Sequence, residues 1–167
     1  MKKLLLLIVL FISVGNGVWA QFPKAIFPGD YPDPSILRDG KDYYMTHSPF
    51  CYAPGFLIWH STDLMHWEPV CRALPEYEGS AMAPDLLKYQ GRYYIYYPTS
   101  TGENYVVYAD DIRGPWSKPV KLDVKGIDPG HVVGEDGKRY LFTNNGWITP
   151  LSDDGLKVTG KSRKVYD

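Results

Sequence analysis

Asp33-Pro-Ser-Ile-Leu-Arg-Asp-Gly-Lys-Asp-Tyr-Tyr-Met45 decides the fold, because two later stretches of the chain repeat its pattern. The repeats are Asp85-Leu-Leu-Lys-Tyr-Gln-Gly-Arg-Tyr-Tyr-Ile-Tyr-Tyr97 and Asp128-Pro-Gly-His-Val-Val-Gly-Glu-Asp-Gly-Lys-Arg-Tyr-Leu-Phe142. Each copy has an aspartate, a short apolar run, a glycine-bearing turn and an aromatic segment. Recurring units of short strands are typical of propeller blades. The pattern therefore predicts blades near residues 31–78, 79–123 and 124–167, with three aspartates at equivalent positions.

Strand signals fill each predicted blade, and no convincing amphipathic helix interrupts them. Turn dipeptides at Asp39-Gly40, Gln90-Gly91 and Asp136-Gly137 favour hairpins between neighbouring strands. The expected strands are 35–38, 42–48, 55–61, 92–98, 104–109, 131–133 and 139–143. The sequence thus predicts an all-β fold.

Composition narrows the classes of ligand. Aromatic residues make up 15% of the chain and its net charge is −1. A nearly neutral chain offers no electrostatic attraction for a phosphate backbone, so nucleic acid is not an expected partner.

The N-terminus has the pattern of a secretory signal peptide. Met1-Lys2-Lys3 precedes an apolar run from Leu4 to Val14. Val18-Trp19-Ala20 then has the small-residue pattern of a cleavage site before Gln21. An uncleaved anchor is the rival interpretation, but the apolar run is shorter than the roughly 20 residues that a membrane span needs. We expect residues 1–20 to be removed, residues 21–167 to form the folded domain without a membrane span, and the protein to be exported to a periplasm or beyond.

Two cysteines, Cys51 and Cys71, fall in the first predicted blade. An exported chain can oxidise such a pair, but a bridge requires Cα atoms within about 7 Å of each other. The sequence leaves a disulfide and two free thiols equally open.

Five motifs in order carry a resemblance to a known family. They are Tyr31-Pro32-Asp33-Pro34-Ser35-Ile36, the stretch from Pro54 to Ser61 leading into Asp63-Leu64 and Trp67, Ala83-Pro84-Asp85-Leu86, Gly114-Pro115-Trp116, and Ile127-Asp128-Pro129. Together they resemble the N-terminal part of glycoside hydrolase family 43, the five-bladed β-propeller β-xylosidases and α-L-arabinofuranosidases. The resemblance implies about three of five blades here, and pentose-containing plant polysaccharides or oligosaccharides as substrate.

The resemblance also implies catalytic roles. Inverting hydrolysis of a glycosidic bond needs a carboxylate that takes a proton from water and an acid that protonates the leaving oxygen. By its motif, Asp33 is the candidate general base, and Asp128 is the candidate that orients the acid and raises its pKa. Taken alone, either aspartate is also compatible with a turn residue that caps a backbone N–H beside proline.

Phe50 and Asp85 are the candidate substrate-binding residues. An aromatic ring packs against the C–H face of a sugar, and Phe50 resembles a pocket-lining ring of xylosidase-like members. Met82 stands where the family has tryptophan, so Asp85 is expected to serve as pocket wall or structural support. His131 is expected to be structural. No residue cluster resembles a metal site, and no cofactor is predicted.

The general acid, a glutamate in the family, is expected beyond Asp128 in a later blade. The glutamates present lie outside the family's acid motif, and they are Glu68, Glu76, Glu78, Glu103 and Glu135. We therefore expect the 167-residue chain on its own to hydrolyse little or nothing.

Three alternatives remain open from the sequence. A family 32 fructan hydrolase would use the first aspartate as nucleophile, but the usual Asn-Asp-Pro-Asn-Gly signature is absent. A non-catalytic carbohydrate-binding propeller would keep the aromatic pocket and dispense with Asp33 and Asp128. A protein-interaction propeller of the kelch or WD type would show repeat signatures that this chain lacks.

Overall fold

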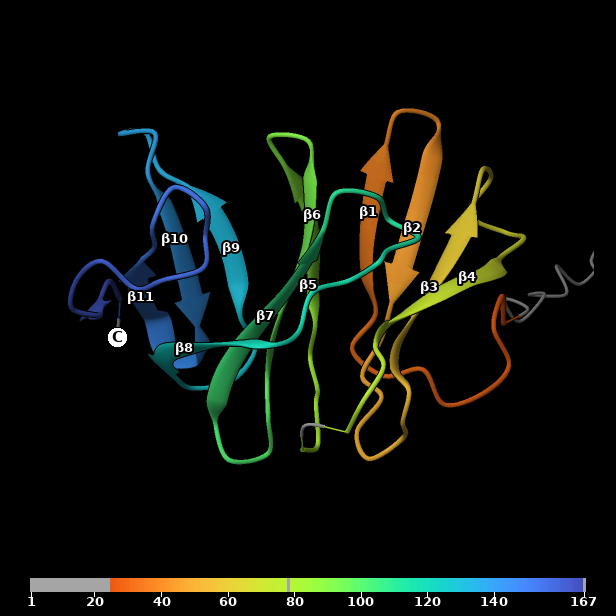
Figure 1. The fold of residues 1–167 in the computed structure, drawn as a ribbon, viewed down its shortest axis with the longest axis horizontal. Helices are drawn as coiled ribbons and strands as arrows, with labels where there is room; N and C mark the ends of the chain where they lie inside the picture. Colours follow the sequence, from red (N-terminus) through yellow and green to blue (C-terminus); the bar gives the residue numbers. More distant parts are fainter. Residues whose placement is uncertain (1–24, 78, 167) are drawn as a thin grey trace, which may run out of the picture.

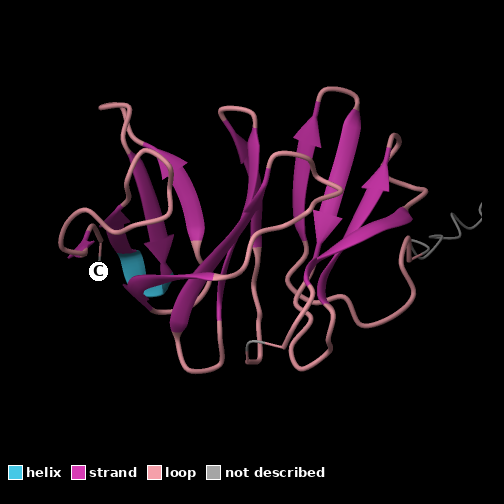
Figure 2. Cartoon of the chain, in the orientation of Figure 1, coloured by secondary structure: helices cyan, strands magenta, loops and turns pink. Residues whose placement is uncertain are grey.

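The computed structural model describes residues 25–77 and 79–166, and strands dominate it (Figure 2). The predicted signal peptide, residues 1–20, lies outside these residues. Within them, the helical structure is one 3₁₀ turn, η1, at Asn144–Gly146. No helix of the described part is long and apolar enough to cross a bilayer.

Twelve strands form three four-stranded antiparallel sheets that stand side by side in chain order (Figure 1). The first sheet contains β1 Ser35–Asp39, β2 Asp42–Thr46, β3 Gly55–Ser61 and β4 Glu68–Leu74. The second contains β5 Asp85–Tyr89, β6 Arg92–Pro98, β7 Glu103–Ala109 and β8 Val120–Lys125. The third contains β9 Gly130–Val133, β10 Arg139–Thr143, β11 Trp147–Pro150 and β12 Arg163–Lys164. These sheets are propeller blades, and the predicted all-β propeller class is confirmed.

Most predicted strands are present with small differences at their ends. The predictions for 55–61, 92–98 and 139–143 match β3, β6 and β10. The predicted strand 42–48 ends at Thr46, because Ser48 and the following residues turn toward the next blade. Strands β4, β5, β8, β11 and β12 were not predicted. In β8 the buried residues Leu122 and Val124 alternate with exposed charged residues, which is a period-2 strand signal that the sequence analysis did not use.

The prediction of three equivalent aspartates is wrong for Asp85. Each inner strand starts two residues after a residue with left-handed backbone, namely Asp33 (φ 52), Ala83 (φ 39) and Asp128 (φ 56). Ala83 therefore takes the place of Asp33 in the second blade. Asp85 is the first residue of β5 and corresponds to Ser35 of β1. The repeated feature is a residue followed by proline just before each inner strand, namely Asp33-Pro34, Ala83-Pro84 and Asp128-Pro129. An alignment on the aspartates alone therefore places the second blade two residues out of register.

Neighbouring blades are joined by the same kind of hydrogen bond at the start of their inner strands. The Ser35 hydroxyl oxygen accepts the backbone N–H of Leu86 at 2.9 Å. One blade further on, the Asp85 carboxylate accepts the backbone N–H of His131 at 2.7 Å. The starts of β1, β5 and β9 consequently lie at one edge of the blades, which brings Asp33, Ala83 and Asp128 to that same edge.

The core lies between the blades, and strand β6 contributes to both of its parts. Tyr93, Ile95 and Tyr97 pack toward the first sheet, while Tyr94 and Tyr96 pack toward the third. Successive side chains of a strand point to opposite faces, so this continuous aromatic run is buried on both. The run explains how the described part of the chain, which has no α-helix, still encloses two hydrophobic layers.

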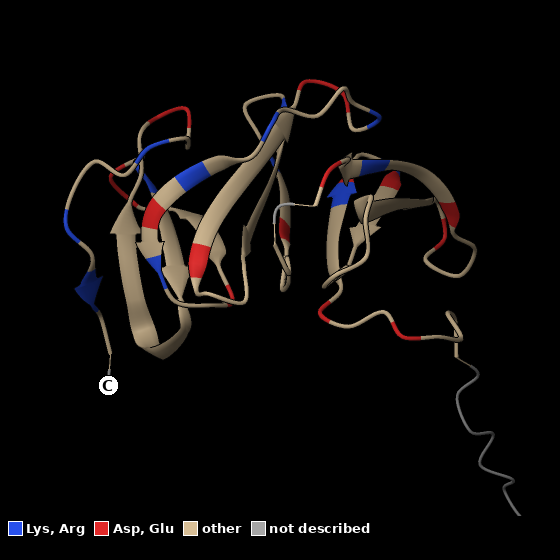
Figure 3. Ribbon diagram, turned by 60° about the horizontal axis from the view of Figure 1, so that its bottom comes forward, with Lys and Arg blue, Asp and Glu red and all other residues tan. Residues whose placement is uncertain are grey.

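The two cysteines are unbonded. Cys51 is exposed, whereas the half-buried thiol of Cys71 donates to the carbonyl oxygen of Ile112 at 3.2 Å. Burial raises the pKa of the Cys71 thiol. Figure 3 shows that charged residues are spread over loops and strands of all three sheets.

Candidate active site

Asp33 is held by a serine hydroxyl from the loop after β2. Its carboxylate oxygen Oδ2 accepts the Ser48 hydroxyl at 2.5 Å, and the Ser48 backbone N–H donates to the Pro32 carbonyl at 3.0 Å. No backbone N–H in residues 25–77 or 79–166 donates to the Asp33 carboxylate. The side chain is therefore not the turn cap that its proline neighbour allowed, and it is exposed at the edge of the blades.

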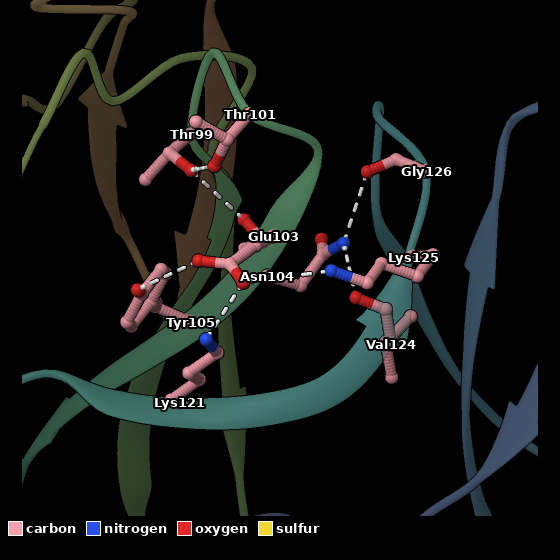
Figure 4. A network of polar contacts seen from close by, with 9 residues as sticks. All are labelled: Thr99, Thr101, Glu103, Asn104, Tyr105, Lys121, Val124, Lys125 and Gly126. Carbon is pink, nitrogen blue, oxygen red and sulfur yellow. Dashed lines mark hydrogen bonds and ion pairs between the residues drawn. The ribbon is translucent and has the colours of Figure 1, made fainter.

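Asp128 is positioned through the backbone that leads into it. Both backbone groups of Ile127 bind Asn144, because the Ile127 N–H donates to Asn144 Oδ1 at 3.1 Å and the Ile127 carbonyl accepts the Asn144 N–H at 2.9 Å. The buried amide of Asn104 donates to the carbonyls of Val124 at 3.2 Å and Gly126 at 3.0 Å (Figure 4). Hydrogen bonds from Asn104 of the second blade and Asn144 of the third blade therefore hold the segment that connects the two blades.

Glu103, beside Asn104 in Figure 4, is occupied by surface lysines. It accepts Lys121 Nζ at 2.7 Å and lies 3.5 Å from Lys125 Nζ. The hydrogen bond from Lys121 lowers the pKa of the Glu103 carboxyl. A carboxyl kept ionised in this way is poorly suited to act as a general acid.

Asp85 is the first residue of β5 and corresponds to Ser35, whereas Ala83 takes the position that Asp33 and Asp128 have in the other blades. Burial raises the pKa of its carboxyl, and the hydrogen bond from the His131 backbone opposes that rise. Its carboxylate joins two blades, which agrees with structural support. A contact with substrate stays a prediction.

His131 belongs to a buried polar network between the second and third blades. The Arg139 guanidinium donates to His131 Nε2 at 2.9 Å, to the Tyr96 hydroxyl at 3.0 Å and to the Asp153 carbonyl at 3.1 Å. It also lies 4.5 Å from the ring centres of both Tyr89 and Tyr94. Because arginine can only donate, His131 must carry its proton on Nδ1. Burial and the Arg139 charge lower the pKa of His131 to about 4.

This network makes stability depend on pH between the two pKa values of His131. Unfolded histidine titrates near 6.5, whereas the folded group titrates at about 4, so the unfolded state binds more protons in that window. We expect the free energy of unfolding to fall as the pH is lowered from 6.5 to 4, and to fall less in His131→Gln. Urea unfolding of both proteins at several pH values measures the difference. Equal slopes would show that folding leaves the pKa of His131 unchanged.

A cavity of about 400 Å³ opens beside the Asp33 segment. Phe50 lines it, with 38% of its surface exposed, and the Phe50 backbone N–H binds the Ala81 carbonyl at 2.9 Å. Two buried polar atoms of the lining residues, His47 Nε2 and Trp59 Nε1, have no hydrogen-bond partner within the described chain. Phe50 thus lines a partly polar, aromatic cavity whose wall includes Pro32, the residue before Asp33.

Trp147 is an exposed aromatic residue that the sequence analysis did not single out. It is 43% exposed and lines a hollow of about 620 Å³ together with Asn144, the residue that binds Ile127. The Asn-Asn-Gly-Trp turn after the third aromatic strand was the available signal.

In the residues that the structure describes, no group of three or more His, Cys, Asp or Glu side chains is placed to hold a metal ion.

Comparison with known proteins identifies the family. The family model described as Glycosyl hydrolases family 43 matches residues 22–167. The chain belongs to glycosyl hydrolase family 43. This family 43 chain is 34% identical to a xylosidase/arabinosidase of Butyrivibrio fibrisolvens, over 84% of its own length and 32% of that protein. It is 35% identical to a non-reducing end alpha-L-arabinofuranosidase of Bacteroides ovatus, over 83% and 29% of the two lengths.

Solved structures show the same relationship. A xylan beta-1,4-xylosidase of Bacillus halodurans superposes with a TM-score of 0.75 at 32% identity, covering 87% of this family 43 chain and 34% of the xylosidase. The chain therefore spans about a third of the length of the relatives that it matches.

Proposed function

We propose that the protein is an exported glycosidase that cleaves O-glycosidic bonds of pentose-containing plant polysaccharides or oligosaccharides, with inversion of configuration. The observation that carries the proposal is the placement of Asp33. Its carboxylate lies at the common edge of the inner strands, bound through one oxygen to a buried serine. Family membership and relatives named as xylosidases and arabinofuranosidases support the substrate class. The signal-peptide pattern of residues 1–20 supports export.

In this proposal Asp33 is the general base. It takes a proton from a water molecule that attacks the anomeric carbon, while a separate carboxylic acid protonates the leaving oxygen on the opposite face. Asp128, at the same edge two blades away, supplies negative charge that keeps the acid protonated near neutral pH. Phe50 provides the apolar surface for the sugar ring. The acid itself is not assigned to any glutamate of this chain.

The test is hydrolysis of aryl β-D-xylopyranoside and aryl α-L-arabinofuranoside by the protein expressed from its complete reading frame. We expect turnover of at least one, and proton NMR of the first-formed sugar should show the anomeric configuration opposite to that of the substrate. Retention of configuration would instead indicate a nucleophilic aspartate. Binding of xylan oligomers without any turnover would support a carbohydrate-binding propeller and refute the glycosidase.

A further inference from the structure

Ser48 makes three hydrogen bonds at the candidate site although only 3% of its surface is exposed. Its hydroxyl oxygen lies 2.5 Å from Asp33 Oδ2 and 2.6 Å from the backbone nitrogen of Ala83. Its backbone N–H donates to the Pro32 carbonyl at 3.0 Å, immediately before Asp33. One residue therefore holds the Asp33 backbone and its carboxylate, and links both to the second blade.

The direction of the hydroxyl proton follows from these partners. The Ala83 N–H can only donate, so it uses a lone pair of the Ser48 oxygen. An ionised carboxylate can only accept, so the Ser48 proton points to Asp33 Oδ2. Hydrogen bonds to an ionised group are shorter and stronger than neutral ones, in keeping with the distance of 2.5 Å.

The other two blades show that the fold itself does not require this hydroxyl. Asn144 and Pro98 occupy the place of Ser48. The Asn144 N–H donates to the Ile127 carbonyl as Ser48 does to Pro32, whereas Pro98, which has no N–H, accepts the Met82 N–H at its carbonyl. Pro98 has no hydroxyl, and the Asn144 side chain accepts the Ile127 N–H instead. Among the residues that the structure describes, only Ser48 uses this position to bind the carboxylate of a site aspartate.

We propose that Ser48 is a positioning residue that aims the Asp33 carboxylate at the attacking water. The proposal rests on the proposed role of Asp33 as general base. Ser48 holds Oδ2, whereas no hydrogen bond within the described chain reaches Oδ1. In the reaction the water oxygen bonds to the anomeric carbon, the bond to the leaving oxygen breaks, and that oxygen takes a proton from the acid. The proton of the water passes to Asp33 Oδ1, and Ser48 keeps its own.

The first experiment removes the hydroxyl. Ser48→Ala should lower kcat by about 10- to 100-fold, the range for a lost hydrogen bond to a charged group, with KM changed less than about 2-fold. Ser48→Thr, which keeps the hydroxyl, should recover most of kcat. If Ser48→Ala does not fold, Ser48→Cys keeps the side-chain volume with a weaker donor and should still lower kcat.

Ser61→Ala is the matched control. Ser61 belongs to the same sheet and is equally buried, at 2% exposure. Its hydroxyl accepts the backbone N–H groups of Asp63 and Leu64 and donates to the Asp63 carboxylate, which is not a candidate site residue. Its removal should leave kcat unchanged. A loss in Ser61→Ala as large as that in Ser48→Ala would show that the effect reflects a weakened sheet, and would overturn the proposal.

A double-mutant cycle separates positioning from folding. If Ser48 acts through Asp33, adding Ser48→Ala to Asp33→Asn should lower the residual kcat no further, measured with an activated aryl glycoside. Multiplied losses would refute the positioning role. Full activity of Ser48→Ala beside an inactive Asp33→Asn would refute this inference alone, whereas an active Asp33→Asn would refute the proposed function itself.

Discussion

Asp33→Asn is expected to lower kcat for aryl xyloside or arabinofuranoside by roughly 10²- to 10⁴-fold, the usual contribution of a general base. Asparagine has nearly the same shape, and its amide oxygen can still accept the Ser48 hydroxyl that holds Asp33 at 2.5 Å. The variant should therefore fold normally and bind substrate with a similar KM. Steady-state kinetics on the protein from the complete reading frame measures the change.

Asp110→Asn is the control for this substitution. Asp110 pairs with Arg92 at 2.7 Å on the surface, and 81% of its side chain is exposed. An exposed ion pair of this kind contributes little to stability, so kcat should not change. Activity of Asp33→Asn within about tenfold of the unmodified protein would mean that another group takes the proton from water.

Gly155→Ala is expected to destabilise the protein by about 3–5 kcal/mol. Gly155 has left-handed backbone, with φ 74, and a Cβ there would clash with the Tyr96 hydroxyl and approach the Arg139 guanidinium carbon to 2.5 Å. Either the loop or the guanidinium must move. Moving Arg139 breaks its hydrogen bonds to Tyr96 and His131 inside the core. Urea unfolding, compared at constant m-value, measures the loss.

Gly137→Ala separates the backbone cost from the clash. Gly137 has almost the same backbone, with φ 75, but a Cβ there would meet no atom within 4 Å. It should cost only the left-handed conformation of alanine, about 1–2 kcal/mol. Equal losses of unfolding free energy in the two variants would show that Arg139 moves aside without a measurable cost in stability.

The propeller could be predicted because its signals are local. Glycine-bearing turns such as Asp39-Gly40 and the aromatic run of β6 identify inner strands wherever they recur. The outer strands lack such signals. Strand β12, for example, is only Arg163–Lys164, and its pairing with β11 depends on a partner more than ten residues away. Tertiary pairing of this kind leaves no periodic pattern to detect.

The candidate site was only partly predictable for the same reason. Asp33, Asp128 and Phe50 stand in recognisable motifs, and the structure places both aspartates at one edge of the blades. Ser48 carries no motif, since its role depends on bonds to Asp33 and to Ala83, which lies 35 residues away. The roles of Asp33 and Asp128 in catalysis, and export, stay predictions.

The hydrogen bonds that join neighbouring blades have a serine as acceptor in one case and an aspartate in the other. Ser35 and Asp85 both accept a backbone N–H of the following blade. The architecture thus selects an acceptor oxygen at this position, and a carboxylate satisfies it without any part in chemistry. A search that counts acidic residues at the starts of inner strands would therefore also count Asp85, whose carboxylate joins two blades.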